Sequence, residues 1–112
     1  MGVSRFEIGI GPNNMFQWKL FGPDGNVTLA SRGFGNKDDA FAEIRAVKEA
    51  APFGERYERR ADDGGKLIFR LKSASHQVLA TGGPFAKEEE RDKAVAAVRS
   101  SVEAAVMDKT VG

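Results

Sequence analysis

Apolar and polar residues alternate in three short segments near the start of the chain, which is the period of a half-buried strand. The strands are expected at residues 5–10, 16–21 and 27–31. Short segments rich in Gly, Pro and Asn separate them and favour tight turns. The residues expected to point inward are Phe6, Ile8, Ile10, Phe16, Trp18 and Leu20. Adjacent strands joined by short turns predict an antiparallel meander.

The period of the pattern changes after residue 36. From Lys37 to Ala51 apolar residues recur three or four positions apart, the spacing of one helical face. Asn36 is a favourable N-cap, and aspartates occupy the first turn, where the helix dipole favours carboxylates. Pro52 and Gly54 are expected to end this helix.

The same pattern recurs 51 residues further along the chain. This shift pairs Phe6 with Tyr57, Trp18 with Phe69, Phe34 with Phe85, Ile44 with Val95 and Val47 with Val98. Residues 29–31 instead match 79–81 at a shift of 50, which we attribute to one-residue differences in two neighbouring turns. We interpret residues 1–51 and 52–112 as two pseudo-symmetric repeats of one domain. Because a unit of this size is marginal alone, the repeats are expected to share a core.

The second repeat differs from the first at both ends of its helix. Residues 88–90 are glutamates that open the helix without a Ser, Thr, Asp or Asn cap. Its apolar stripe is expected to contain Val95, Val98 and Val102. Residues 102–107 alternate in polarity and favour a short closing strand.

Several motifs of the chain resemble those of the YegP-like family of small bacterial proteins. They are Glu55-Arg56-Tyr57-Glu58, Gly65-Lys66 and the segment 71–77 in the second repeat, and Trp18-Lys19-Leu20, Leu29-Ala30-Ser31 and the segment 44–48 in the first. The resemblance spans nearly the whole chain. It implies tandem β-β-β-α-β units that form one sheet, with their closing strands exchanged, and it implies no activity, catalytic residue or cofactor. With the patterns above it predicts an α+β fold, one antiparallel sheet with two helices on one face.

Composition and charge narrow the classes of function. The 112 residues carry 17 Lys and Arg against 16 Asp and Glu, a balance that excludes a strongly basic nucleic-acid binder. Cysteine is absent, which excludes a disulfide scaffold, thiol catalysis and thiolate metal sites. The single histidine, His76, falls in a polar turn and cannot by itself form a His-rich metal site. The sequence shows no export signal or membrane-spanning run, so we expect a cytoplasmic protein that does not associate with membranes.

The motifs that could carry chemistry each have a simpler structural explanation. Residues 9–11 would begin a dinucleotide-binding fingerprint, but Asn14 stands where a glycine is required and no helix follows. Residues 33–37 open a helix but lack the spacing of a phosphate-binding loop. The aspartate pairs at 38–39 and 62–63 fit a helix start and a turn. We therefore expect no enzyme activity, no cofactor and no metal site.

One face of the predicted sheet is left without helices and could bind a partner. It mixes cations with apolar groups, and the candidate partner residues are Lys19, Phe21, Arg60, Ile68, Arg70 and Lys72. Sheets that stack nucleic-acid bases present several outward aromatic residues, whereas here only Phe21 is expected to point outward. These features favour a non-enzymatic module that binds a protein partner, as a monomer or a homodimer. Weak nucleic-acid binding through this face is the alternative, and simple solvent exposure is the third reading.

Overall fold

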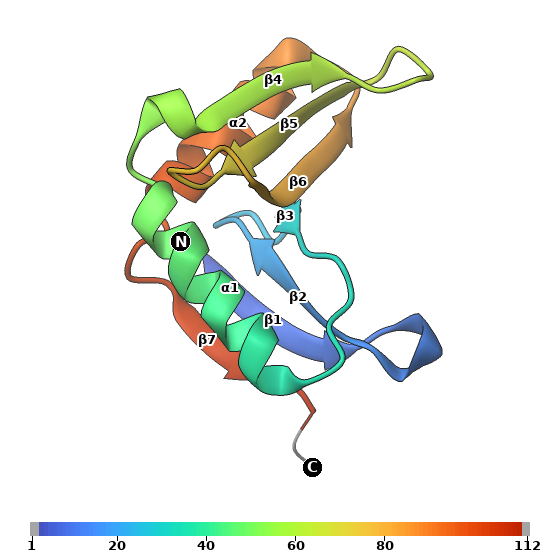
Figure 1. The fold of residues 1–112 in the computed structure, drawn as a ribbon. Coiled ribbons are helices and arrows are strands. Elements are labelled where there is room, and N and C mark those ends of the chain that lie inside the picture. The colour runs from blue at the N-terminus through green and yellow to red at the C-terminus, as the bar shows by residue number, and fades with distance from the viewer. Residues whose placement is uncertain (1–2, 111–112) are drawn as a thin grey trace.

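A computed structural model describes residues 3–110 of the chain (Figure 1). The elements in chain order are β1 (Arg5–Ile10), β2 (Phe16–Phe21), β3 (Val27–Ala30), α1 (Lys37–Ala50), β4 (Tyr57–Ala61), β5 (Leu67–Lys72), β6 (Val78–Phe85), α2 (Glu88–Arg99) and β7 (Ala105–Asp108). Short 3-10 turns, η1 (Pro12–Asn14) and η2 (Gly54–Arg56), precede β2 and β4. The order β-β-β-α therefore occurs twice, and β7 follows the second helix. Within the described residues, neither helix has the length and apolar character needed to cross a membrane.

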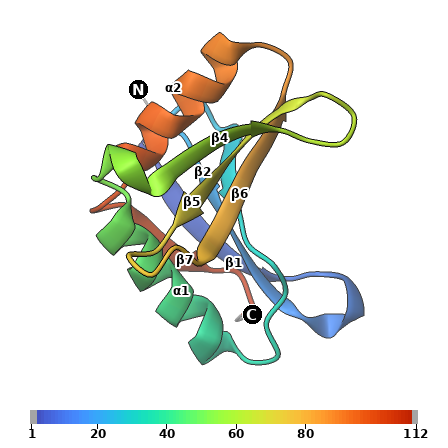
Figure 2. The same ribbon diagram turned by 45° about the horizontal axis from the view of Figure 1, so that its top comes forward.

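All seven strands form one sheet in the order β4-β5-β6-β3-β2-β1-β7. Both helices lie on the same face of this sheet, which confirms the predicted α+β fold (Figure 2). Neighbouring strands are antiparallel except for β1 and β7, so the sheet is mixed in detail. Of the two closing strands that the resemblance implies, the described residues contain only β7, because the chain after α1 passes through η2 directly into β4.

The β2–β3 and β5–β6 hairpins have the same register. In the β2–β3 hairpin Lys19 pairs with Ala30, Leu20 with Leu29 and Phe21 with Val27. In the β5–β6 hairpin the corresponding pairs are Arg70 with Thr81, Leu71 with Ala80 and Lys72 with Val78. Each hairpin skips one residue at its last pair. Each residue of the first hairpin therefore corresponds to the residue 51 positions later in the second, so residues 29–31 correspond to 80–82. The predicted local shift of 50 is wrong.

The hydrophobic core lies between the sheet and the two helices. Its largest fully buried side chains include Phe6, Trp18, Leu20, Phe69 and Leu71 from the strands. Helix α1 contributes Ile44 and Val47, and α2 contributes Val95 and Val98, from the apolar stripes that the sequence predicts.

Two residues expected in the core are exposed. Ile10 is 58% exposed because it is the last residue of β1, beside the exposed turn η1. Val102 is 41% exposed because α2 ends at Arg99, before the predicted stripe is complete.

Local chemistry explains two further features of the fold. The Asn36 side chain caps α1 by accepting a hydrogen bond from the Asp39 amide at 2.9 Å, as expected. Gly82 permits the close approach of β6 to β3. A Cβ at this position would lie 2.3 Å from the Phe69 ring and 2.4 Å from the Thr28 carbonyl oxygen.

Candidate functional site

Three of the candidate partner residues gather around one carboxylate on the face opposite the helices. Nitrogen atoms of Lys72, Arg60 and Arg70 lie 2.8, 3.3 and 3.9 Å from the carboxylate oxygens of Glu58. The hydrogen bond from Lys72 is the largest of the causes that hold the pKa of the Glu58 carboxyl below its usual value. The three cations therefore share a single carboxylate, and the cluster keeps an excess of positive charge.

The remaining candidate residues lie apart from that cluster or are hidden. Lys19 is exposed on β2. Phe21 is half-buried beneath the guanidinium of Arg5, which lies 4.5 Å from the ring centre and pairs with Glu7 at 2.7 Å. Ile68, expected to be exposed, is only 9% exposed, because β5 lies between β4 and β6 and both strands flank it. The prediction of Ile68 as a surface residue is wrong.

The charges on this face alternate across the sheet. One row of cross-strand neighbours runs Glu58, Arg70, Thr81, Ala30, Lys19, Glu7 and Met107. Acid and base therefore stand side by side on both sides of the β6–β3 junction. Within this row the two acidic residues match the two basic ones, whereas Arg60 and Lys72 beside Glu58 leave the wider face with an excess of cations.

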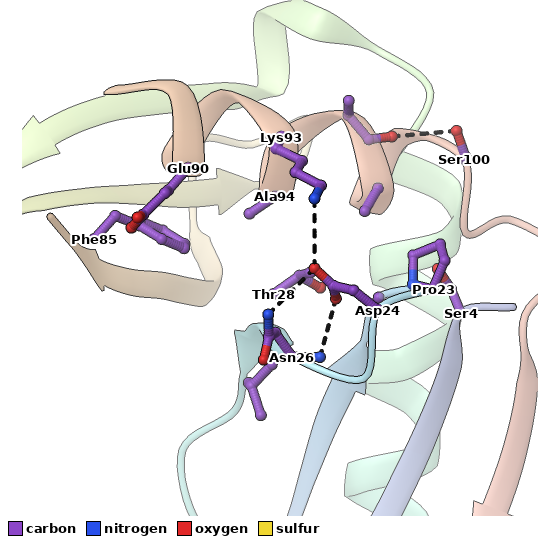
Figure 3. A pocket seen from close by; sticks show the side chains of 14 residues that line it. Ser4, Pro23, Asp24, Asn26, Thr28, Phe85, Glu90, Lys93, Ala94 and Ser100 are labelled. Carbon is purple, nitrogen blue, oxygen red and sulfur yellow. Dashed lines mark hydrogen bonds and ion pairs between the residues drawn. The ribbon is translucent and has the colours of Figure 1, made fainter. Parts of the chain in front are cut away.

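A cleft lies on the helical side of the sheet, between α2 and the turn that joins β2 to β3 (Figure 3). Its volume is about 850 Å³. The apolar side chains that line it are Pro23, Val27, Phe85, Ala94, Ala96 and Ala97. We call it the α2 cleft. It is large enough to take a side chain or a small molecule.

Polar groups from both walls meet at the α2 cleft. Asp24 on the turn accepts hydrogen bonds from the Asn26 amide at 3.0 Å and from the Asn26 side chain at 3.2 Å. The backbone bond is the largest cause of the lowered pKa of the Asp24 carboxyl. Lys93 reaches from α2 toward Asp24, with Nζ 3.7 Å from Oδ2 (Figure 3). Because the Lys93 side chain is 77% exposed, this ion pair is weak and can open.

At three positions of the cleft wall α2 carries smaller side chains than α1 carries at the corresponding positions. The positions related by 51 residues are Ala94 and Glu43, Ala96 and Arg45, and Ser100 and Glu49. The Nε1–H of Trp18 donates a hydrogen bond to the Glu43 carboxylate at 3.1 Å. Phe69, the counterpart of Trp18, has no such donor, and Ala94 offers no acceptor. Burial raises the pKa of the Glu43 carboxyl, and the bond from Trp18 opposes this rise.

Sequence reasoning did not identify the α2 cleft. Alanines in a helix are ordinary helix formers, and the 22–26 segment is an ordinary turn. The signal that could have found it is the replacement of Glu43 and Arg45 by alanines in the second half.

The fold and the cleft define a small α+β protein with one seven-stranded sheet, two helices on one face and one open sheet face. The chain belongs to the UPF0339 family, which includes the YegP proteins, as the sequence resemblance indicated. The model of a domain of unknown function, DUF1508, matches residues 62–108.

The similarity to relatives covers most of each chain. A UPF0339 protein encoded in the 5′ region of the ptx operon of Stutzerimonas stutzeri is 36% identical over 95 residues, covering 85% of this chain and 86% of the relative. YegP of Escherichia coli K12 is 30% identical over 96 residues, covering 86% of this chain and 87% of the relative.

Two solution structures share the fold. The UPF0339 protein of Shewanella oneidensis has a TM-score of 0.87 and 26% identity, and the alignment covers 96% of this chain and 92% of that one. YegP of E. coli, described as a protein of unknown function, has a TM-score of 0.87 and 28% identity, with 100% and 97% covered. These descriptions assign no activity to the family.

Proposed function

We propose that this chain is a small non-enzymatic binding module that recognises a protein partner, and that the α2 cleft takes an apolar side chain of that partner. The observation that carries the proposal is the alanine wall of α2. At the corresponding positions α1 carries the larger residues Glu43 and Arg45, whereas α2 presents Ala94 and Ala96 to the cleft. Concave apolar sites with a few polar groups at the margin are the usual form of a binding site.

The charge arrangement favours a protein partner over nucleic acid. Two carboxylates stand among the five cations of the open sheet face, so phosphates would have to compete with them there. Glu58 contacts Lys72, Arg60 and Arg70, and Glu7 pairs with Arg5 and lies opposite Lys19. Nucleic-acid binding depends on cations that are available to neutralise phosphates. The lining of the α2 cleft instead suits an apolar side chain, with the Asp24–Lys93 pair available to polar groups beside it.

The substitution Ala96→Arg tests the proposal by giving α2 the residue that α1 carries at this position. Ala96 is exposed, so the variant should fold. Ala42→Arg adds the same charge at an exposed position of α1 and serves as the matched control. Each protein is immobilised and exposed to bacterial lysate with and without nuclease. We expect the parent and the Ala42→Arg variant to retain the same protein after nuclease, and Ala96→Arg to lose it.

Three results would contradict the proposal. Retention of the same partner by a folded Ala96→Arg variant would exclude the α2 cleft as the site. Material that nuclease removes, and that weakens steeply with salt, would support nucleic-acid binding, and Ala96→Arg would then strengthen retention because it adds a cation. Turnover of a substrate that one substitution in this chain abolishes would show that the module is an enzyme.

A further inference from the structure

The middle of the open sheet face has the same arrangement of residues in both halves of the chain. Its central cross-strand row consists of Arg70 on β5, Thr81 on β6, Ala30 on β3 and Lys19 on β2. The shift of 51 residues relates Lys19 to Arg70 and Ala30 to Thr81. The row is therefore pseudo-symmetric about the β6–β3 junction, with a cation on each side of two short side chains.

Beyond each of these cations the row continues to a carboxylate. Glu7 on β1 lies opposite Lys19, and Glu58 on β4 lies opposite Arg70. These two carboxylates are also 51 residues apart, so the whole acid–base pair occurs in both halves. Both helices lie on the other face of the sheet, so packing against a helix does not account for this repetition (Figure 2).

The carboxylates are bound mainly by other cations. Glu7 accepts a hydrogen bond from Arg5 at 2.7 Å, and Glu58 accepts one from Lys72 at 2.8 Å. Arg70 comes no closer to Glu58 than 3.9 Å, which is too long for a hydrogen bond. Among residues 3–110, Lys19 forms no ion pair with a carboxylate. The donor groups of Lys19 and Arg70 are therefore available to a ligand.

Positive charge is concentrated on this face of the sheet. The two carboxylates stand among five cations, Arg5, Lys19, Arg60, Arg70 and Lys72. A hollow of about 220 Å³ over β1 and β2 adds Lys109 to the surroundings of Glu7 and Lys19. The whole chain has a formal net charge of only +1, so the other surfaces together carry an excess of acidic residues.

We propose that the open sheet face binds an acidic segment of a partner protein, with its carboxylates on Lys19 and Arg70 and its backbone over Ala30 and Thr81. Charge complementarity favours an acidic occupant. Three strand spacings of about 4.8 Å separate β5 from β2, so carboxylates about 14 Å apart fit the two cations. Four residues of an extended segment span about 13 Å, so acidic residues four positions apart match this distance. The α2 cleft lies on the opposite side of the sheet, so this proposal does not depend on it.

The surroundings of the two cations favour a protein segment over a nucleic acid. Every nucleotide carries a phosphate, so a strand that extends beyond Lys19 and Arg70 brings phosphates toward Glu7 and Glu58. A protein segment can carry neutral residues at those positions. Phe21 lies half-buried beneath Arg5, whose guanidinium is 4.5 Å from the ring centre, so this ring is not free to stack on a base.

A synthetic peptide tests the proposal on the full chain labelled with ¹⁵N. The probe is acetyl-Glu-Glu-Ser-Ser-Glu-Glu-amide, which carries acidic residues four positions apart, and its control has Gln in place of each Glu. In NMR titrations at low salt, we expect the acidic peptide to shift the amide signals of Lys19, Ala30, Arg70 and Thr81. The control peptide should shift none of them.

Four variants assign the binding to particular side chains. Lys19→Gln and Arg70→Gln, one in each half, should each weaken binding about two- to fivefold, the range of one exposed ion pair. Glu58→Gln should tighten binding by a similar factor, because it removes a carboxylate that competes with the peptide. Arg45→Gln removes an exposed cation of α1 and should leave binding unchanged. The dispersion of the amide signals shows whether each variant is folded.

Four results would overturn the proposal. The first is the absence of shifts at Lys19 and Arg70 with the acidic peptide at its solubility limit. The second is equal weakening by Arg45→Gln, which would show unspecific attraction of charge. The third is weaker binding by a folded Glu58→Gln variant, which would show that this carboxylate supports the ligand. The fourth is tighter binding of a five-nucleotide oligothymidylate with the same four charges, which would assign the face to nucleic acid.

Discussion

Replacing Trp18 by alanine should remove a large part of the stability of the fold. The side chain is fully buried, meets Phe6 edge to face with ring centres 5.5 Å apart, and donates to Glu43 at 3.1 Å. Truncating a buried aromatic residue costs about 3–5 kcal/mol, while a whole domain is stable by about 5–15 kcal/mol. The substitution also leaves the half-buried Glu43 carboxylate without its donor, which adds to the cost at neutral pH.

Urea unfolding followed by far-UV circular dichroism measures this loss, because Trp18 is the sole tryptophan and its fluorescence disappears in the variant. Each kcal/mol lowers the Tm of a domain of about this size by roughly 4–8 °C. Phe69→Ala, at the corresponding buried position, should cost about 3–5 kcal/mol as well. Lys19→Ala, next to Trp18 but on the opposite face, should change stability by less than about 0.5 kcal/mol.

A Trp18→Ala variant that unfolds within a few degrees of the parent would refute the inward placement of this residue. A Lys19→Ala variant that loses as much stability as Trp18→Ala would show the same. Either result would mean that β2 is displaced by one residue, because such a displacement exchanges the two faces of a strand.

Three further predictions concern charge and close packing. Glu43→Gln should raise the Tm at pH 7 and leave it unchanged below pH 4.5, the pKa of the carboxyl in the unfolded chain. Burial raises the pKa of Glu43 in the folded protein, so the parent loses stability as pH rises from the unfolded pKa to the folded pKa. Gly82→Ala should cost about 3 kcal/mol in urea unfolding, because the new Cβ would overlap the Thr28 carbonyl. Asp108→Asn should lower the Tm at pH 7, because Lys37 lowers the pKa of the Asp108 carboxyl from 3.8 to about 2. The ionised Asp108 stops stabilising the fold as pH falls from about 4 to 2, so the Tm of the variant should fall less than that of the parent over this range.

The sequence alone determined the local elements and the sides they bury. Helix α1 begins at Lys37 and ends at Ala50, one residue from the expected end, because the Asn36 cap and the proline at 52 are local signals. Helix α2 begins at Glu88, as its acidic first turn indicated. The closing strand begins at Ala105 and not at 102, because the chain first makes a turn in which Ala104 donates to Ser101. That turn uses backbone groups, which leave no mark on the polarity pattern.

Only the tertiary structure decided what lies beside each element. The alternation of polar and apolar residues predicts which face of β5 carries Ile68, but the burial of its side chain depends on the strands on either side. The approach of Arg70 and Lys72 to Glu58, the parallel pairing of β7 with β1, and the α2 cleft all join residues of different elements. Periodicity records how one segment divides between core and solvent, a local property. Strand order and cavities depend on which distant segments meet, and that is decided by the packing of the whole chain.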